Sequence, residues 1–204
     1  EEDSQGITLM FLLSGIDTRA CPSTSEIKEI WERCKIGYRG LAIFQHPRED
    51  TVFMNVTEVE GKSGLNPRDL TDATVECRRQ AWQVLEIMRE HVPGFENAYI
   101  EQTAPALGVR ETRRIRGTYV LNQDDVLGGA DFPDTVARAS CPVDIHGSDN
   151  DGQGDYRRLK QSYGIPYRSL LTEAVPNLLV TGRPVSADRV AHSSLRRIAP
   201  DRKS

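Results

Sequence analysis

The sequence predicts an α+β fold with a mixed, mainly antiparallel sheet backed by one long helix, followed by a C-terminal segment of α/β character. Three observations support this prediction. Apolar residues recur at three- and four-residue steps from residue 67 to 92, the stripe of a core-facing helix. Short apolar or alternating runs separated by turn residues predict antiparallel strands. Residues 177–181 (NLLVT), followed by Gly182, have the pattern of a strand buried on both faces.

Composition predicts a soluble protein of one large domain or two small ones. The chain has 204 residues, of which 38% are hydrophobic and 27% charged, and its formal net charge is −4. A negative net charge provides no bulk basic field to attract nucleic acid. No apolar run approaches the roughly 20 residues that a membrane span requires. We therefore expect neither a nucleic-acid nor a membrane partner.

The first residues and the cysteines favour a cytoplasmic location. The start, EEDSQG, lacks the basic region of a secretory signal. The four cysteines form no CxxC pair, and no histidine lies at metal-ligand spacing beside them. We expect separate thiols and no metal site, with a Cys21–Cys34 disulfide as the open alternative.

The N-terminal part predicts a central strand and a capped helix. Residues 7–13 (ITLMFLL) form a continuous apolar run of strand length. Ser23 and Glu26 then fit a capping box, in which each side chain accepts a backbone N–H of the first helical turn. Gly37 is expected to end this helix.

A β-hairpin follows. Residues 41–44 and 51–59 read as strands, and residues 47–50 (PRED) between them have turn chemistry. Residues 98–103 predict a further strand of the same sheet.

The long helix is predicted between Pro67 and Val92. Asn66 is a suitable N-cap, Pro67 suits the first helical position, and Asp69 places a carboxylate where the helix dipole favours it. Pro93 and the glycine after it end the pattern. We assign this helix to the core rather than to chemistry.

The densest polar cluster is the segment from residue 108 to 117, GVRETRRIRG. Guanidinium groups this close repel one another unless an anion lies among them, and Glu111 is one such partner. Two interpretations stay open. Residues 112–118 are either a solvated basic strand with local ion pairs, or they present arginines that hold a carboxylate or phosphate in bidentate fashion.

The C-terminal half predicts shorter elements. Residues 122–127 form a capped helical turn ended by two glycines, and residues 135–145 form a strand interrupted at Pro142. Residues 147–162 are polar and glycine-containing and predict a flexible loop without a dinucleotide fingerprint or a complete calcium loop. Ser186 is expected to begin a short polar helix.

Several segments together resemble one family. They are TLMF…SGID, NPRDLTDATVECRRQAWQV, GVRETRRIRGTYVLNQDDVLGG, FPDTVARASCPVDIH and YGIPYRSLL…NLLVTGRPVSADRVAHSSLR. In this order they resemble the FAD-dependent oxidoreductases of the glutathione-reductase superfamily that carry a GVRETRR-type segment. The resemblance runs from Ile7 to about Arg196. It implies a substrate-type α+β domain over residues 1–146, a loop over 147–162, and a partial FAD-binding α/β domain, the return segment, over 163–204.

The resemblance also implies a cofactor, a reaction and site residues. FAD would mediate hydride transfer with a small organic substrate, and the catalytic residue is unknown. The residues expected to line the cofactor are Gly182, Arg183, Ser186, His192, Ser194 and Arg196. The residues expected on the substrate side are Arg110, Arg113 and Tyr167.

The sequence departs from the family pattern at two points. It contains no GxGxxG segment, which normally supplies the backbone N–H groups that receive the pyrophosphate. After Arg196 it does not continue into a Gly/Ala-rich helix. We therefore expect a fragment of a larger oxidoreductase that neither retains FAD tightly nor turns over alone. Its expected partners are the missing nucleotide-binding segment or a second copy. The alternative is a non-catalytic module that binds an anion or a partner through residues 110–116.

Overall fold

The computed structural model describes residues 5–34, 40–145 and 155–196 and divides them into two compact units. Unit 1 comprises residues 6–109, and unit 2 comprises Gln5 together with residues 110–196. The predicted domain boundary at residue 146 differs from this division, which lies between Val109 and Arg110. The difference arises because strand β5 (Thr135–Ala139), in the predicted first domain, pairs with strand β8 (Tyr163–Pro166), in the predicted third.

Unit 1 contains a four-stranded antiparallel sheet in the order β2-β3-β1-β4. Its strands are β1 (Phe11–Ser14), β2 (Ile43–Gln45), β3 (Val52–Met54) and β4 (Tyr99–Thr103). The predicted hairpin and central strand are confirmed, but the strands are shorter than predicted. Before β1, Ile7 and Thr8 form only single bridges, with Val59 and Gly108.

Both predicted helices of unit 1 are present, with the predicted N-caps. In α1 (Thr24–Arg33), the Ser23 and Glu26 side chains form the complete capping box. In α2 (Pro67–His91), the Asn66 side chain accepts a hydrogen bond from the backbone N–H of Arg68 at 3.0 Å. Gly37, the expected end of α1, lies outside the described residues.

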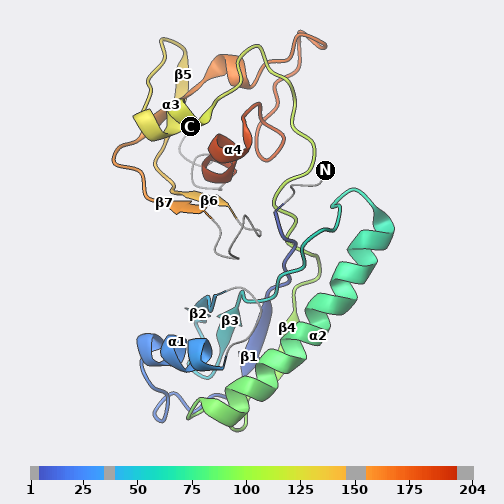
Figure 1. Cartoon of the computed structure of the whole chain (residues 1–204), viewed down its shortest axis with the longest axis vertical. Helices are drawn as coiled ribbons and strands as arrows, with labels where there is room; N and C mark the ends of the chain where they lie inside the picture. Colours follow the sequence, from blue (N-terminus) through green and yellow to red (C-terminus); the bar gives the residue numbers. More distant parts are fainter. Residues whose placement is uncertain (1–4, 35–39, 146–154, 197–204) are drawn as a thin grey trace. The chain divides into compact units, whose positions relative to one another are not determined.

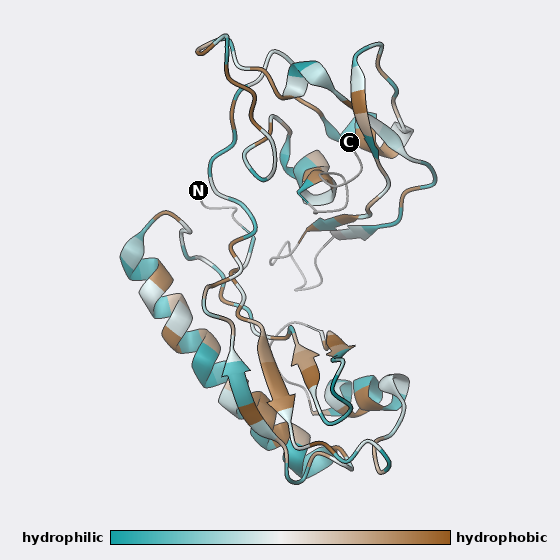
Figure 2. Ribbon diagram, turned by 180° about the vertical axis from the view of Figure 1, so that it is seen from behind, coloured by the Kyte–Doolittle hydropathy of each residue, from teal (hydrophilic) through white to brown (hydrophobic). Residues whose placement is uncertain are grey.

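The core of unit 1 lies between the sheet and the apolar faces of its helices (Figure 1). Phe11 and Leu13 from β1 and Met54 from β3 pack in one buried cluster with Leu85 and Met88 from α2. Figure 2 shows the hydrophobic residues along the central strands and in stripes on α2. Removal of these side chains from water, about 25 cal/mol per Å² of apolar surface, is what fixes α2 on the sheet.

Unit 2 is built from two small antiparallel sheets and short helices. The strand pairs are β5 (Thr135–Ala139) with β8 (Tyr163–Pro166), and β6 (Val143–Ile145) with β7 (Asp155–Arg157). The helical segments are α3 (Gln123–Gly128), the 3₁₀ turn η1 (Tyr167–Ser169) and α4 (Arg189–Leu195). The predicted break at Pro142 and the glycine end of α3 are confirmed, since Gly129 adopts a left-handed conformation.

Three predictions for unit 2 are wrong in part. Residues 177–181 do not form a buried strand, because Leu178 and Leu179 are 45% and 52% exposed and only Leu179 forms a bridge, to Leu171. A continuous apolar run indicates burial only when neighbouring strands cover it. Residues 112–118, predicted as a basic strand, likewise form only a single bridge, between Gly117 and Thr172.

The predicted loop 147–162 is also only partly retained. Residues 155–157 are β7, paired with β6, and residues 146–154 lie outside the described part of the chain. In the parts that the structure describes, no helix is long and apolar enough to cross a membrane.

Candidate functional site

The short helix α4 carries a cluster of buried polar side chains. Its N-cap, Asp188, accepts the backbone N–H of Ala191 at 2.7 Å with one carboxylate oxygen and that of Gln123 at 2.7 Å with the other. The bond from Gln123 joins the N-cap of α4 to the start of α3. Residues 192–194 are consecutive polar residues, and all are fully buried. Because burial of a polar group costs free energy unless it is hydrogen-bonded, their partners define the site.

His192 connects α4 to two distant segments. Its Nε2 lies 2.9 Å from the carbonyl oxygen of Arg183. Its Nδ1 lies 3.7 Å from Oε2 of Glu111, whose side chain is only 8% exposed. Glu111 in turn accepts the backbone N–H of Gln5 at 2.9 Å through Oε1. One imidazole therefore faces the basic segment on one side and the Gly182 turn on the other.

Burial decides the electrostatics of His192. Loss of water around the ring lowers the pKa of His192, and the nearby guanidinium groups of Arg114 and Arg196 lower it further. The Arg183 carbonyl and the Glu111 carboxylate act in the opposite direction. The balance favours the neutral ring near neutral pH.

Ser194 and Arg196 are held by contacts inside unit 2. The Ser194 hydroxyl donates to the Cys141 carbonyl at 2.5 Å and lies 2.9 Å from the Tyr163 hydroxyl. Burial raises the pKa of Tyr163 to about 12. Arg196 donates from Nη2 to the Asp144 carbonyl at 3.0 Å and to the Gln5 side chain at 3.3 Å. These bonds tie the end of α4 to the strand pair β6–β7 and to Gln5.

The turn from Gly182 to Ser186 is the open part of this region. Gly182 has φ +76, and a Cβ placed on it would meet no atom within 4 Å. The turn is closed by a hydrogen bond from the Val185 N–H to the Gly182 carbonyl at 3.2 Å. Ser186 is fully buried, and its hydroxyl has no hydrogen-bond partner among the described residues.

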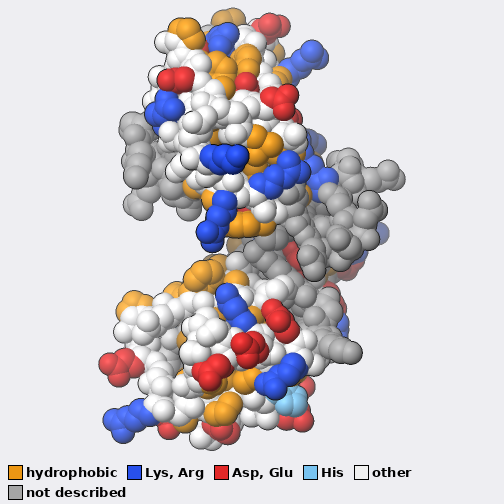
Figure 3. Space-filling model, turned by 60° about the vertical axis from the view of Figure 1, so that its left-hand side comes forward, with side chains coloured by type: hydrophobic (Ala, Val, Ile, Leu, Met, Phe, Trp, Pro, Cys, Tyr) orange, Lys and Arg blue, Asp and Glu red, His pale blue; other side chains and the backbone are white. Residues whose placement is uncertain are grey.

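The basic segment runs beside this turn. The Ile115 N–H donates to the Pro184 carbonyl at 2.8 Å, and Arg113, Arg114 and Arg116 around it are exposed. Figure 3 shows Lys and Arg side chains beside hydrophobic ones on one face of unit 2. The segment is therefore attached through its backbone, which leaves its guanidinium groups at the surface.

The predicted site residues are brought together only in part. Arg183 and His192 are in direct contact, and Ser194 and Arg196 lie at the end of the same helix. Arg110 is half-buried. Tyr167 is 41% exposed and donates its N–H to the Asp134 carbonyl at 2.8 Å. In the part of the chain that the structure describes, no hydrogen bond or ion pair joins Tyr167 to the α4 cluster.

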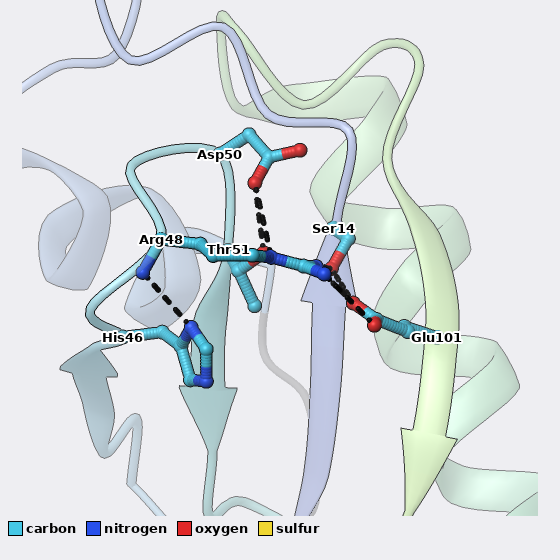
Figure 4. A network of polar contacts seen from close by, with 6 residues as sticks. All are labelled: Ser14, His46, Arg48, Asp50, Thr51 and Glu101. Carbon is cyan, nitrogen blue, oxygen red and sulfur yellow. Dashed lines mark hydrogen bonds and ion pairs between the residues drawn. The ribbon is translucent and has the colours of Figure 1, made fainter.

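A second polar centre, in unit 1, was not predicted from the sequence (Figure 4). Arg48 donates to Ser14 at 2.9 Å, to Thr51 at 2.8 Å and to both carboxylate oxygens of Glu101. Hydrogen bonds from Ser14 and Arg48 lower the pKa of Glu101. Leu12 of β1 pairs with Gln102 and Leu13 with Ile100, so Glu101 between them is the unpaired residue of a β-bulge in β4. Such a bulge redirects a side chain.

The Arg48 centre attaches the β2–β3 turn to the middle of β4 and to the end of β1. Arg48 also lies 3.6 Å from Asp50, and its backbone N–H donates to Nδ1 of His46 at 3.1 Å. The guanidinium is therefore already surrounded by acceptors within unit 1. The sequence PRED (residues 47–50) predicted the turn, but two partners of Arg48, Ser14 and Glu101, lie on strands far away in the sequence.

Comparison with known proteins identifies the family. A family model described as FAD dependent oxidoreductase matches residues 8–200. The chain belongs to this family. A search of curated proteins and a search of solved structures each found no match. The predicted resemblance is thus confirmed at the level of an FAD-dependent oxidoreductase family, and the family implies a flavin cofactor.

The candidate site residues of the chain differ in how well they fit the flavin that the family implies. The Gly182 turn fits, because open space lies beside its backbone and the buried Ser186 hydroxyl has no hydrogen-bond partner in the described part of the chain. Ser194 and His192 fit direct contact less well, because the Ser194 hydroxyl and Nε2 of His192 already bond to groups of unit 2. These two residues fit a supporting position behind the turn.

Proposed function

We propose that the chain forms part of an oxidoreductase in which hydride passes between a small organic substrate and FAD, with the turn from Gly182 to Ser186 along the cofactor. The observation that supports this most is the pairing of an open, left-handed glycine with a buried hydroxyl that has no hydrogen-bond partner among the described residues. Glycine in such a turn lets a ligand approach the backbone closely. When bound, FAD would supply the redox chemistry, while the protein orients the reactants and excludes water.

The remaining residues take supporting roles in this proposal. His192 and Ser194 hold the turn and α4 from inside unit 2. Arg113, with the other exposed guanidinium groups of its segment, attracts an anionic group of the substrate or the cofactor. Arg110 and Tyr167 stay predictions on the substrate side.

We further propose that a nucleotide-binding segment outside these 204 residues completes the cofactor site. No GxGxxG segment occurs in the sequence, so the cradle of N–H groups for the pyrophosphate would come from elsewhere. The chain by itself then binds FAD weakly and below one equivalent. Isolation of the chain with a full equivalent of tightly bound flavin would contradict this. The predicted cytoplasmic location and the absence of nucleic-acid partners stay proposals.

A matched pair of glycine variants tests the role of the turn. Gly182 and Gly61 both have positive φ, +76 and +68, and both have open space where a Cβ would lie. Gly182→Ala and Gly61→Ala therefore carry similar backbone strain, but only the first places a methyl group beside the proposed cofactor. Titration of each variant with FAD, followed by flavin fluorescence, should show weaker binding for Gly182→Ala alone. Equal affinities in the two variants would contradict the assignment of the turn.

A second candidate function is anion binding without catalysis through residues 110–116. The exposed guanidinium groups of Arg113, Arg114 and Arg116 on one segment favour it. Titration with inorganic phosphate and small carboxylates should give saturable binding that Arg113→Ala weakens. Arg78→Ala, an exposed arginine of α2, is the control for loss of charge. Binding that is absent, or equally weakened in both variants, removes this candidate.

A further inference from the structure

Three consecutive carbonyl groups of the Gly182 turn, at residues 182–184, each accept a hydrogen bond. The Gly182 carbonyl accepts from the Val185 N–H at 3.2 Å, and the Pro184 carbonyl accepts from the Ile115 N–H at 2.8 Å. Between them, the Arg183 carbonyl lies 2.9 Å from Nε2 of His192. The middle contact is the only one of the three that comes from a side chain.

The chemistry of this contact determines the tautomer of His192. A carbonyl oxygen only accepts hydrogen bonds, so Nε2 must carry the hydrogen. In the neutral ring, Nδ1 is then the unprotonated nitrogen, which agrees with its lack of a hydrogen-bond partner in the described residues. Protonation of His192 adds a hydrogen at Nδ1, toward Glu111, and keeps Nε2 as the donor to the Arg183 carbonyl.

Charged groups also surround the ring. Glu111 faces Nδ1 at 3.7 Å, while the guanidinium groups of Arg114 and Arg196 also act on the ring. Glu111 is itself kept in place by the backbone N–H of Gln5. Acidification would therefore strengthen the contact to Glu111. The contact to the turn is present in both protonation states and is stronger when the ring is charged.

We propose that His192 is a positioning residue that fixes the Gly182–Pro184 turn through an Nε2–H bond to the Arg183 carbonyl, with Glu111 as its partner on the far side of the ring. Its importance for the cofactor rests on the proposed function, but the positioning itself does not. His192 acts on the turn in every protonation state of the ring. Glu111 sets only how readily the ring takes a second proton.

Two variants of His192 separate the hydrogen bond from simple packing. His192→Gln keeps a side-chain N–H that reaches toward the carbonyl, whereas His192→Leu fills a similar volume without a donor. A net hydrogen bond contributes about 0.5–1.5 kcal/mol, so local hydrogen exchange at Val185 and Ile115 should become about 2- to 10-fold faster in His192→Leu. In His192→Gln it should stay close to that of the unmodified chain. Equal exchange rates in the two variants would overturn the proposal.

A measurement on the unmodified chain keeps the proposal testable if His192→Leu fails to fold. Nitrogen-15 NMR of the His192 ring should show hydrogen on Nε2 from neutral pH downward, and a neutral ring with hydrogen on Nδ1 would refute the proposal. Glu111→Gln should lower the pKa of His192 further, because a favourable carboxylate is removed. Titration of the His192 variants with FAD then tests the proposed function separately. Faster exchange at the turn with unchanged FAD affinity would retain the positioning role and refute the turn as the cofactor contact.

Discussion

Replacement of Ser194 by alanine should destabilise unit 2 more than removal of its partner hydroxyl at Tyr163. In the folded chain, Ser194 gives its proton to the Cys141 carbonyl, so the Tyr163 hydroxyl must donate to the Ser194 oxygen. Ser194→Ala leaves both of these groups without this partner, and Tyr163 is fully buried. Each buried group left unsatisfied costs about 1–3 kcal/mol, so for two such groups we expect a loss of roughly 2–6 kcal/mol.

Tyr163→Phe removes only one hydrogen bond, because Ser194 keeps its bond to Cys141. The expected loss is about 0.5–1.5 kcal/mol. In the double variant, no tyrosine hydroxyl is left unsatisfied. Its loss should therefore be smaller than the sum of the two single losses by about 1 kcal/mol, which a double-mutant cycle measures.

Urea unfolding can follow each unit separately. Both tryptophans, Trp31 and Trp82, belong to unit 1, so tryptophan fluorescence serves as an internal control that should not change. Hydrogen exchange of α4 and β8 reports on unit 2. An unchanged stability in Ser194→Ala, together with weaker FAD binding, would refute this reasoning and indicate that Ser194 contacts the cofactor directly.

Four further predictions concern other residues. Gly117→Ala should destabilise unit 2 by about 1–3 kcal/mol, because the added Cβ would lie 2.8 Å from the Cβ of Ser186 and 2.9 Å from the Leu171 carbonyl oxygen. Thermal unfolding measures this loss, and Gly128→Ala, whose added Cβ meets no atom within 4 Å, is the control. Ser23→Ala should cost about 1 kcal/mol in a urea titration of unit 1, since it removes the N-cap of α1, and an unchanged midpoint would contradict this. Tyr163 should titrate near pH 12 in ultraviolet difference spectra; because its pKa is raised on folding, its contribution to stability is complete below about pH 10 and is lost as the pH rises toward 12. His192 has the opposite dependence: its pKa is lowered on folding, so stability should fall as the pH drops below about 6.5, and His192→Gln should abolish that part of the pH profile.

The local elements could be predicted because their signals lie within a few residues of one another. The capping box at Ser23, the cap at Asn66 and the glycines after α3 each satisfy free backbone groups through neighbours in the sequence. The antiparallel hairpin follows from a turn sequence between two apolar runs. Such signals do not depend on the rest of the chain.

The prediction of a buried strand at residues 177–181 was wrong because burial of a strand depends on distant parts of the chain. An apolar run looks the same whether other strands cover it or not, and here Leu178 and Leu179 remain substantially exposed. The division of the chain at Arg110 was missed likewise, since the pairing of β5 with β8 joins residues on either side of the predicted loop.

The candidate site shows the same division. Resemblance to the family named His192 and Ser194 but not their partners. The basic pattern around Glu111 indicated an anion among arginines without showing that His192 would lie beside it. Only folding brings Glu111 beside His192 and His192 beside the Arg183 carbonyl. In the same way, Arg48 meets Glu101 only because a bulge redirects that carboxylate.

The sequence by itself determined α1 and α2 with their N-caps, the glycine end of α3, the hairpin and the family, because propensity, capping and motif order are local or linear properties. The tertiary structure alone decided where the units divide and which buried polar groups pair. Those pairings depend on which distant segments share a core, since a polar group taken from water requires whichever partner the fold brings within hydrogen-bond distance.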